Sequence, residues 1–147
     1  MDIRQTLLPG LTLALTVVLA ACAPVEPASP PADGAELLGT AWELVSLKGA
    51  AAIEGKPVTL RFGETSIEGS GGCNTYGGSY MASGNSLSLE GLYWTEMACI
   101  EPAGIMDQEQ AYFRALDAGA SYRADRGRLE VFDEAGAQIL AFDTADG

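Results

Sequence analysis

The chain has 147 residues, a formal net charge of −12 and no histidine. This acidic balance argues against binding to nucleic acid and against adsorption to anionic lipid, because both need a cationic surface. The lack of histidine removes the commonest general base, the Ser-His-Asp and Cys-His arrangements, and most zinc sites. We therefore expect a protein that is not an enzyme and that holds no cofactor or metal.

The N-terminus is typical of an export signal. Arg4 precedes an apolar run from Leu11 to Ala21, which is too short to span a bilayer because a spanning helix needs about 20 residues. The run ends in Leu19-Ala20-Ala21-Cys22, which resembles the lipobox of bacterial lipoproteins. We expect a signal peptide over residues 1–21, cleavage before Cys22, and a diacyl, palmitate-bearing anchor on Cys22. The alternative is an ordinary signal peptide, cut at an Ala-x-Ala site, with an incidental cysteine.

The residues after Cys22 bear on where the protein is held. In Gram-negative lipoproteins an aspartate at this place marks retention at the inner membrane, and here the residue is Ala23. We therefore expect anchoring in the outer membrane, facing the periplasm. Residues 22–36 contain four prolines and few apolar side chains, so they cannot form a helix or a core. At about 3.1 Å per residue, this tether would reach up to about 40 Å from the membrane.

Apolar and polar residues alternate from Leu37 onward, which predicts short antiparallel strands with one buried face. The first strands are expected at about residues 41–47 and 58–62. A glycine-dense segment follows, from Gly69 to Tyr80. A phosphate-binding loop would need a following helix and usually a lysine, and neither is present, so we expect two strands joined by a tight turn. Ser83-Gly84-Asn85 marks a hairpin turn before a strand at 86–90.

The pattern changes to a helical period between Ile105 and Ala118. One side of this expected amphipathic helix carries Ile105, Met106, Tyr112, Phe113 and Leu116. The other side carries Asp107, Gln108, Glu109, Gln110, Arg114 and Asp117. Pro102 fits near the helix start, and Gly119 fits just past its end as a C-cap.

Two strands are expected after the helix, at residues 128–133 and 138–142, joined by a turn at Glu134-Ala135-Gly136. The folded part is therefore α+β and mostly β. An antiparallel sheet that curls around or against one amphipathic helix would bury the apolar faces of both.

Two cysteines, Cys73 and Cys99, remain once Cys22 is lipidated. An even pair in an exported domain predicts a disulfide. It would close a loop of about 25 residues and contribute about 3.5 kcal/mol in the chain-entropy model. Two separate buried thiols or a redox pair are the alternatives, although there is no Cys-x-x-Cys spacing and no neighbouring basic residue to activate a thiol.

Two other sets of residues are candidate sites. Separated carboxylates could indicate a metal site or paired-carboxylate catalysis, but in a chain this acidic we expect a solvated surface; they are Glu96, Glu101, Asp107 and Glu109. Tyr93 and Trp94 are neighbours in an expected strand and point to opposite faces. We expect one of these two rings in the core and the other exposed.

Together these motifs resemble the META domain, the family of the HslJ-like envelope lipoproteins. The resemblance begins at Gly39–Ser46, which includes Trp42, and covers about residues 37–142. Its central signature comprises Gly71, Gly72, Cys73, Asn74, Tyr76, Gly78 and Tyr80. A second signature lies in Thr95–Cys99 and includes Met97, Ala98 and Cys99. Glu109, Phe113 and Leu116 match the helix that follows, and we assign residues 37–143 to this domain.

The resemblance implies a cracked-barrel-like sheet packed with one helix, and it implies no reaction. Members of the family are linked to stress and antibiotic tolerance in bacteria. We therefore expect a non-catalytic, lipid-anchored envelope module that binds a protein partner or serves stress tolerance. The alternative is a carrier that holds a lipid or small apolar ligand in the sheet interior. A carrier needs an apolar cavity on the order of a few hundred cubic ångströms, whereas a partner-binding module can have a packed core.

Overall fold

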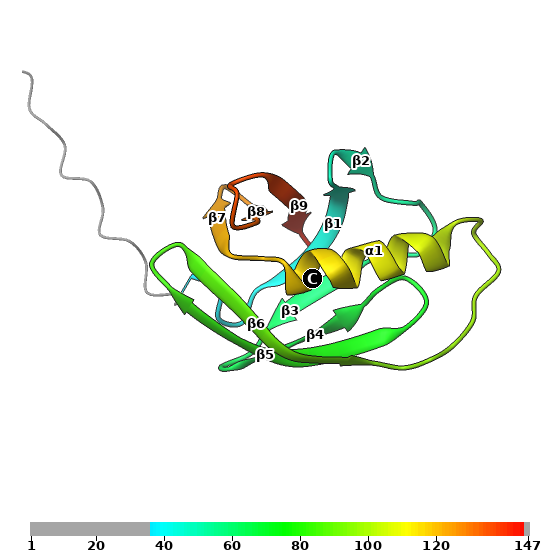
Figure 1. Ribbon diagram of the computed structural model, residues 1–147, viewed down its shortest axis with the longest axis horizontal. Helices are drawn as coiled ribbons and strands as arrows, with labels where there is room; N and C mark the ends of the chain where they lie inside the picture. The colour runs from blue at the N-terminus through cyan, green and yellow to red at the C-terminus, as the bar shows by residue number, and fades with distance from the viewer. Residues whose placement is uncertain (1–35, 146–147) are drawn as a thin grey trace, which may run out of the picture.

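The computed structural model describes residues 36–145 (Figure 1). The expected signal peptide at 1–21, the lipid on Cys22 and nearly all of the tether at 22–36 lie outside the described residues. Among residues 36–145, no helix is long and apolar enough to cross a membrane.

Nine strands and one helix make up the described part. In chain order the first six strands are β1 (Ala41–Leu47), β2 (Ala50–Ala51), β3 (Thr59–Phe62), β4 (Ser66–Ser70), β5 (Thr75–Ser83) and β6 (Ser86–Trp94). Helix α1 (Ile105–Asp117) follows, and the chain then forms β7 (Ser121–Asp125), β8 (Arg128–Phe132) and β9 (Gln138–Thr144). Residues 95–104, which join β6 to α1, are called the connecting segment below.

The strands form one antiparallel sheet in the order β2-β1-β3-β4-β5-β6-β7-β8-β9, and a further β1–β9 pairing closes it into a ring. The β1–β9 contact is extensive and runs from Trp42↔Thr144 to Leu47↔Leu140. The β6–β7 contact is reduced to a single pair, Ser86↔Ser121. The ring is therefore weakly joined at one place and is not a regular barrel. The expected mostly β, curled and cracked-barrel-like sheet with one helix is confirmed.

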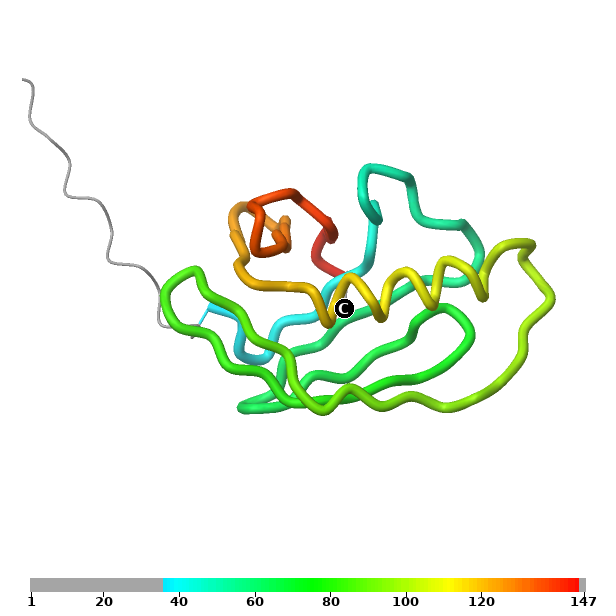
Figure 2. Tube along the Cα trace, in the orientation of Figure 1, coloured from blue at the N-terminus to red at the C-terminus, as the bar shows by residue number. Residues whose placement is uncertain are grey.

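Alternation along the strands explains which side chains fill the ring. On β3, Leu60 and Phe62 are buried while Arg61 is exposed, as expected for a strand with one face toward the core. Helix α1 lies across the ring (Figures 1 and 2). Tyr112 on this helix packs edge-on against Phe142 of β9, with ring centroids 6.3 Å apart.

The helix lies at the expected residues, but two roles assigned to residues in and beside it were wrong. Glu109 was assigned to the solvent side and is instead 2% exposed, so that assignment was wrong. Gly119 was also wrongly assigned as the C-cap, because the helix is capped by Ala118 in a right-handed conformation. Gly119 lies close to the sheet, where an added Cβ would approach Val131 Cγ1 to 3.0 Å. Its small size serves packing instead of capping.

All expected strands and both expected turns are present. The first strand is confirmed at β1, the strand pair within residues 69–80 is formed by β4 and β5, and the 83–85 turn joins β5 to β6. Strands β2 and β7 were not predicted. Strand β2 has two residues and β7 has five, so neither gives a long alternating pattern. Strand β9 extends two residues beyond the expected end, to Thr144.

Phe113 provides a test of the helix as a core element. Its ring is 6% exposed and contacts Tyr76, Tyr112 and Trp94. We expect Phe113→Ala to lower the free energy of unfolding by about 3–5 kcal/mol, because the change removes a large buried ring and leaves a cavity. Denaturant unfolding of both proteins measures this, and a loss under about 1 kcal/mol would contradict a core role for α1.

Candidate functional site

The turn between β4 and β5 lies directly against helix α1. An added Cβ at Gly71 would lie 2.7 Å from Glu109 Oε2 and 2.8 Å from Phe113 Cζ. Gly72 has φ +109°, and an added Cβ there would lie 2.7 Å from Ile105 Cδ1. Only glycine combines this close approach with that backbone conformation. The two glycines therefore let the turn and the helix touch.

The Glu109 carboxylate bonds the helix to this turn. Oε2 accepts hydrogen bonds from the backbone N–H groups of Cys73, at 3.0 Å, and Asn74, at 2.6 Å. Oε1 accepts a hydrogen bond from the Asn74 side-chain amide at 2.6 Å. A buried carboxylate is costly unless it is hydrogen-bonded, and these three donors satisfy it.

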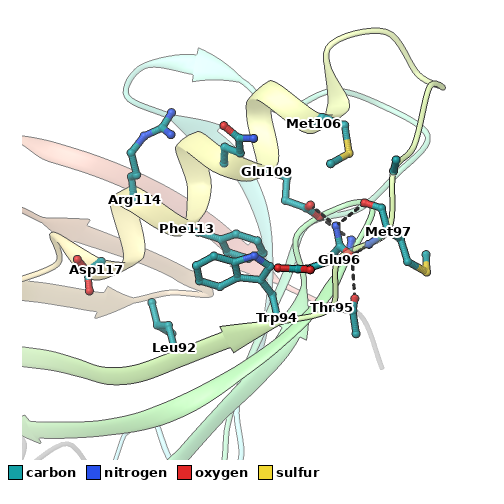
Figure 3. A pocket seen from close by; sticks show the side chains of 13 residues that line it. Leu92, Trp94, Thr95, Glu96, Met97, Met106, Glu109, Phe113, Arg114 and Asp117 are labelled. Carbon is teal, nitrogen blue, oxygen red and sulfur yellow. Dashed lines mark hydrogen bonds between the residues drawn. The ribbon is translucent and has the colours of Figure 1, made fainter.

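Asn74 extends this network to the connecting segment. Its side-chain carbonyl accepts hydrogen bonds from Thr95 Oγ1 at 2.8 Å and from the Met97 N–H at 2.7 Å. Its amide also donates to the Met97 carbonyl at 3.1 Å. Figure 3 shows these bonds in one continuous chain from the helix. Asn74 is 2% exposed and links the turn, the helix and the connecting segment.

A disulfide between Cys73 and Cys99 adds a covalent link at the same place. The sulfur atoms are 2.01 Å apart and the Cα atoms are 5.9 Å apart. The predicted pairing is confirmed. It joins the β4–β5 turn to the connecting segment at Cys99. Asn74 holds the same segment at Met97, so the stretch from Met97 to Cys99 is fixed at both ends.

Two tyrosines lie beneath this network in the core. The Tyr76 and Tyr112 hydroxyl groups are 2.7 Å apart, and Tyr76 also donates to the Thr59 carbonyl at 2.8 Å. Burial raises the pKa of the Tyr76 hydroxyl above its usual value, and burial also raises the pKa of Tyr112. Both rings stay neutral at physiological pH, so this pair is a structural hydrogen-bonded element.

An open groove runs between α1 and the end of β6, and we call it the helix–β6 groove. Its volume is about 600 Å³. One side is lined by Leu92 and Trp94 of β6 and by Met97 of the connecting segment. The helix side is lined by Met106, Phe113 and Arg114. The Trp94 ring stacks on Phe113 at 4.8 Å between centroids and 18° between planes, as Figure 3 shows. Glu96 and Asp117 add carboxylates to the lining.

Three apolar side chains that follow one another along β6 and the connecting segment face solvent. Trp94 is 48% exposed, Met97 57% and Ile100 89%. Tyr93 is also exposed, at 68%, so the expectation that one of Tyr93 and Trp94 is a core residue was wrong. One face of the Trp94 ring stacks on Phe113, and the ring lies at the mouth of the groove. A rigidly held apolar surface of this kind is typical of a binding site.

The sequence motifs divide between this site and the core. Gly71, Gly72, Cys73, Asn74, Met97, Ala98 and Cys99 meet around the groove and its polar network. Trp42, Tyr76 and Tyr80 are core residues, and Gly78 lies where the β5–β6 register shifts. Trp42 Nε1 donates to Thr40 Oγ1 at 2.7 Å and Tyr80 donates to the Gly63 carbonyl at 3.0 Å.

Sequence reasoning missed the buried role of Glu109, although a signal for it existed. Glu109 lies four residues after Ile105 and four before Phe113, so it belongs to the same helix stripe as these buried residues. The other three candidate carboxylates, Glu96, Glu101 and Asp107, are exposed as expected. Within residues 36–145, no group of three acidic or cysteine side chains is placed to hold a metal.

Comparison with known proteins places the chain in a family. The model of the META domain matches residues 35–146. The chain belongs to the META domain family. No curated protein matches the sequence.

Solved structures are similar to this chain in fold. A protein from Burkholderia xenovorans solved by NMR is 26% identical, with a TM-score of 0.63 over 89% of this chain and all of that one (100%). A second NMR structure is also 26% identical, with a TM-score of 0.61 over 76% of this chain and 93% of that one. A crystal structure of a DUF4847 family protein from Bacteroides vulgatus ATCC 8482 is 13% identical, with a TM-score of 0.55 over 75% of this chain and 95% of that one, and it shares the fold.

Glu109→Gln tests whether the carboxylate holds the helix to the turn. The replacement puts an amide NH₂ where an oxygen accepts N–H donors and removes the charge that strengthens those bonds. We expect the free energy of unfolding to fall by about 2–3 kcal/mol. Glu96→Gln is the matched control, because Glu96 is exposed, and it should change stability by less than about 0.5 kcal/mol. Equal effects of the two substitutions in denaturant unfolding would contradict this role.

Proposed function

We propose that this META domain protein is a non-catalytic module, held at an envelope membrane by a lipid on Cys22, that binds a protein partner through the helix–β6 groove. The observation that carries this proposal is the set of exposed apolar side chains, Trp94 and Met97 above all, at a groove whose wall is fixed by Asn74 and a disulfide. Fixing a binding surface before association lowers the entropy cost of binding.

The chemistry of the site favours binding over catalysis. Glu109 is the buried carboxylate of the groove, and its two oxygens accept three hydrogen bonds from Cys73 and Asn74. These bonds hold the carboxylate in a structural role and leave it poorly placed to take a proton from a substrate. The chain has no histidine to act in its place.

The packing of the ring favours a protein partner over a lipid carried in the sheet interior. Tyr112, Leu116 and Phe142 occupy that interior, and each is 0% exposed. A buried acyl chain would have to displace such side chains, whereas the helix–β6 groove is already open at the surface. Partner binding at this groove is also how we expect the protein to serve envelope stress tolerance.

Cys22 supplies the membrane anchor in this proposal. The Leu19-Ala20-Ala21-Cys22 sequence supports lipidation, and Ala23 supports sorting to the outer membrane, where the domain would face the periplasm. A net charge of −12 opposes adsorption of the domain to anionic lipid. Membrane attachment of the domain then depends on the lipid.

Cys22→Ser tests the anchor. The serine protein should be left uncleaved or released as soluble material, because serine cannot form the thioether to the lipid. Fractionation of cells that express each protein, with mass measurement of the mature N-terminus, distinguishes these results. Serine protein that still fractionates with membranes at the mature size would show that the anchor is elsewhere.

Met97→Lys tests the groove, and the chain offers a matched control. Met81 on β5 is 62% exposed, close to the 57% of Met97, but it does not line the groove. A photo-crosslinking amino acid at Gln110, a groove-lining residue, should give a discrete crosslinked product in the envelope. We expect Met97→Lys to reduce that product at least about tenfold, since a buried charge in an apolar contact is costly, and Met81→Lys to leave it unchanged.

Two outcomes would contradict partner binding at the groove. One is a crosslinked product that Met97→Lys and Met81→Lys affect equally. The other is the lack of any product from Gln110 when crosslinking elsewhere on the surface succeeds.

A further inference from the structure

Strand β6 has an edge that its neighbour β7 leaves largely unpaired. The two strands share the single pair Ser86↔Ser121, while β6 continues to Trp94. The end of the strand, from Leu92 to Trp94, therefore has β5 on one side and no strand on the other within the described ring. The helix–β6 groove occupies that other side, and it is lined by both Leu92 and Trp94.

The direction of the backbone groups follows from the hydrogen bonds to β5. The Thr95 N–H donates to the Thr75 carbonyl at 3.1 Å, on the β5 side. Successive residues of a strand direct their backbone groups to opposite edges. The N–H and C=O of Trp94 therefore point away from β5, toward the groove. The groove combines a strand edge with apolar side chains beside it.

We propose that the helix–β6 groove takes an extended, cationic peptide segment of a partner protein, added as a strand along β6 from Leu92 to Trp94. This inference rests on the proposed function and names the chemistry of its partner. The peptide backbone pairs with the free edge of β6, and alternate apolar side chains of the peptide contact Trp94 and Met97. Strand addition to a free sheet edge is a recurring mode of peptide recognition.

Other occupants fit these observations less well. An acyl chain has no backbone N–H or C=O groups to pair with the β6 edge. The chain's own tether, residues 22–36, contains four prolines, which lack N–H donors, and the carboxylates Glu26, Asp33 and Glu36. A second copy of the chain also carries a net charge of −12, so edge-to-edge pairing of two copies brings like charges together.

The charges that line the groove predict that the peptide is cationic. The groove lining contains the exposed carboxylates Glu96 and Asp117 and a single guanidinium, that of Arg114, within a protein whose net charge is −12. Lysine or arginine side chains on the solvent-facing positions of the added strand would lie in this negative field. Complementary charge of this kind raises the association rate and makes binding sensitive to salt.

The test begins with a displayed library of random peptides of about twelve residues, long enough for one strand. The target is the protein purified from cells that express the full chain, and the Met97→Lys and Met81→Lys proteins are panned in parallel. Enriched peptides should alternate apolar residues with lysine or arginine. They should bind the Met81→Lys protein normally and the Met97→Lys protein at least about tenfold more weakly.

Two measurements on an enriched peptide separate strand addition from other binding. Amide hydrogen exchange of the segment that contains Leu92 and Trp94 should slow when the peptide is bound. Methylation of alternate backbone nitrogens of the peptide, on the edge that faces β6, should weaken binding at least about tenfold. The proposal is supported if the bound peptide slows amide hydrogen exchange in β6 and if its affinity depends on its own backbone N–H groups.

Several results would overturn strand addition. One is that panning enriches no peptides on the unsubstituted protein beyond those found on the Met97→Lys protein. Another is that the enriched peptides carry apolar residues at helical spacing. A third is that N-methylation of the peptide leaves its binding unchanged. Palmitate that protects the same amides, or a protein that self-associates through β6, would replace the peptide as occupant. If the Gln110 crosslink remains sensitive to Met97→Lys while strand addition fails, the proposed function stands and only this partner chemistry is wrong.

Discussion

The Glu109 carboxylate is the interaction on which the rest of the site depends. It joins helix α1 to the β4–β5 turn through the N–H groups of Cys73 and Asn74, and no cation pairs with it in the described part of the chain. Such a carboxylate is stable only while all its donors remain in place. This requirement fixes the distance between helix and turn, and the glycine at position 71 is the residue type that this distance permits.

The same network determines the shape of the groove. The Asn74 side-chain carbonyl accepts a hydrogen bond from the Met97 N–H, and the Asn74 side-chain amide donates a hydrogen bond to Glu109. Met97 is thus held by its backbone while its side chain is left in solvent. The disulfide at Cys99 fixes the chain two residues further on. The polar network and the disulfide give an exposed apolar surface a defined geometry, which an unconstrained connection of this length would lack.

The sequence predicted the elements of this fold better than their relation to one another. Alternation at Leu60 and Phe62 and the helical stripe through Tyr112 and Leu116 are local patterns, and both were recognised. The Cys73–Cys99 pairing followed from an even cysteine count in a chain that the sequence predicts to be exported. The burial of Glu109 was not predicted, because a carboxylate side chain is normally exposed to solvent. Its hydrogen-bond donors come from a turn about 35 residues earlier in the chain. The groove also depends on packing between distant segments, which no local pattern reports.

The insertion of α1 between β6 and β7 explains why the core is filled while a strand edge stays free. The ring closes fully between β1 and β9, but residues 95–120 separate β6 from β7 along the chain and leave one pair between them. The buried face of the helix, with Tyr112 and Leu116, fills the ring. Its other flank, with Phe113 and Arg114, forms a wall beside the open end of β6. One element therefore removes space for a ligand from the interior and creates a groove at the surface, so binding by this fold is expected at the β6 edge.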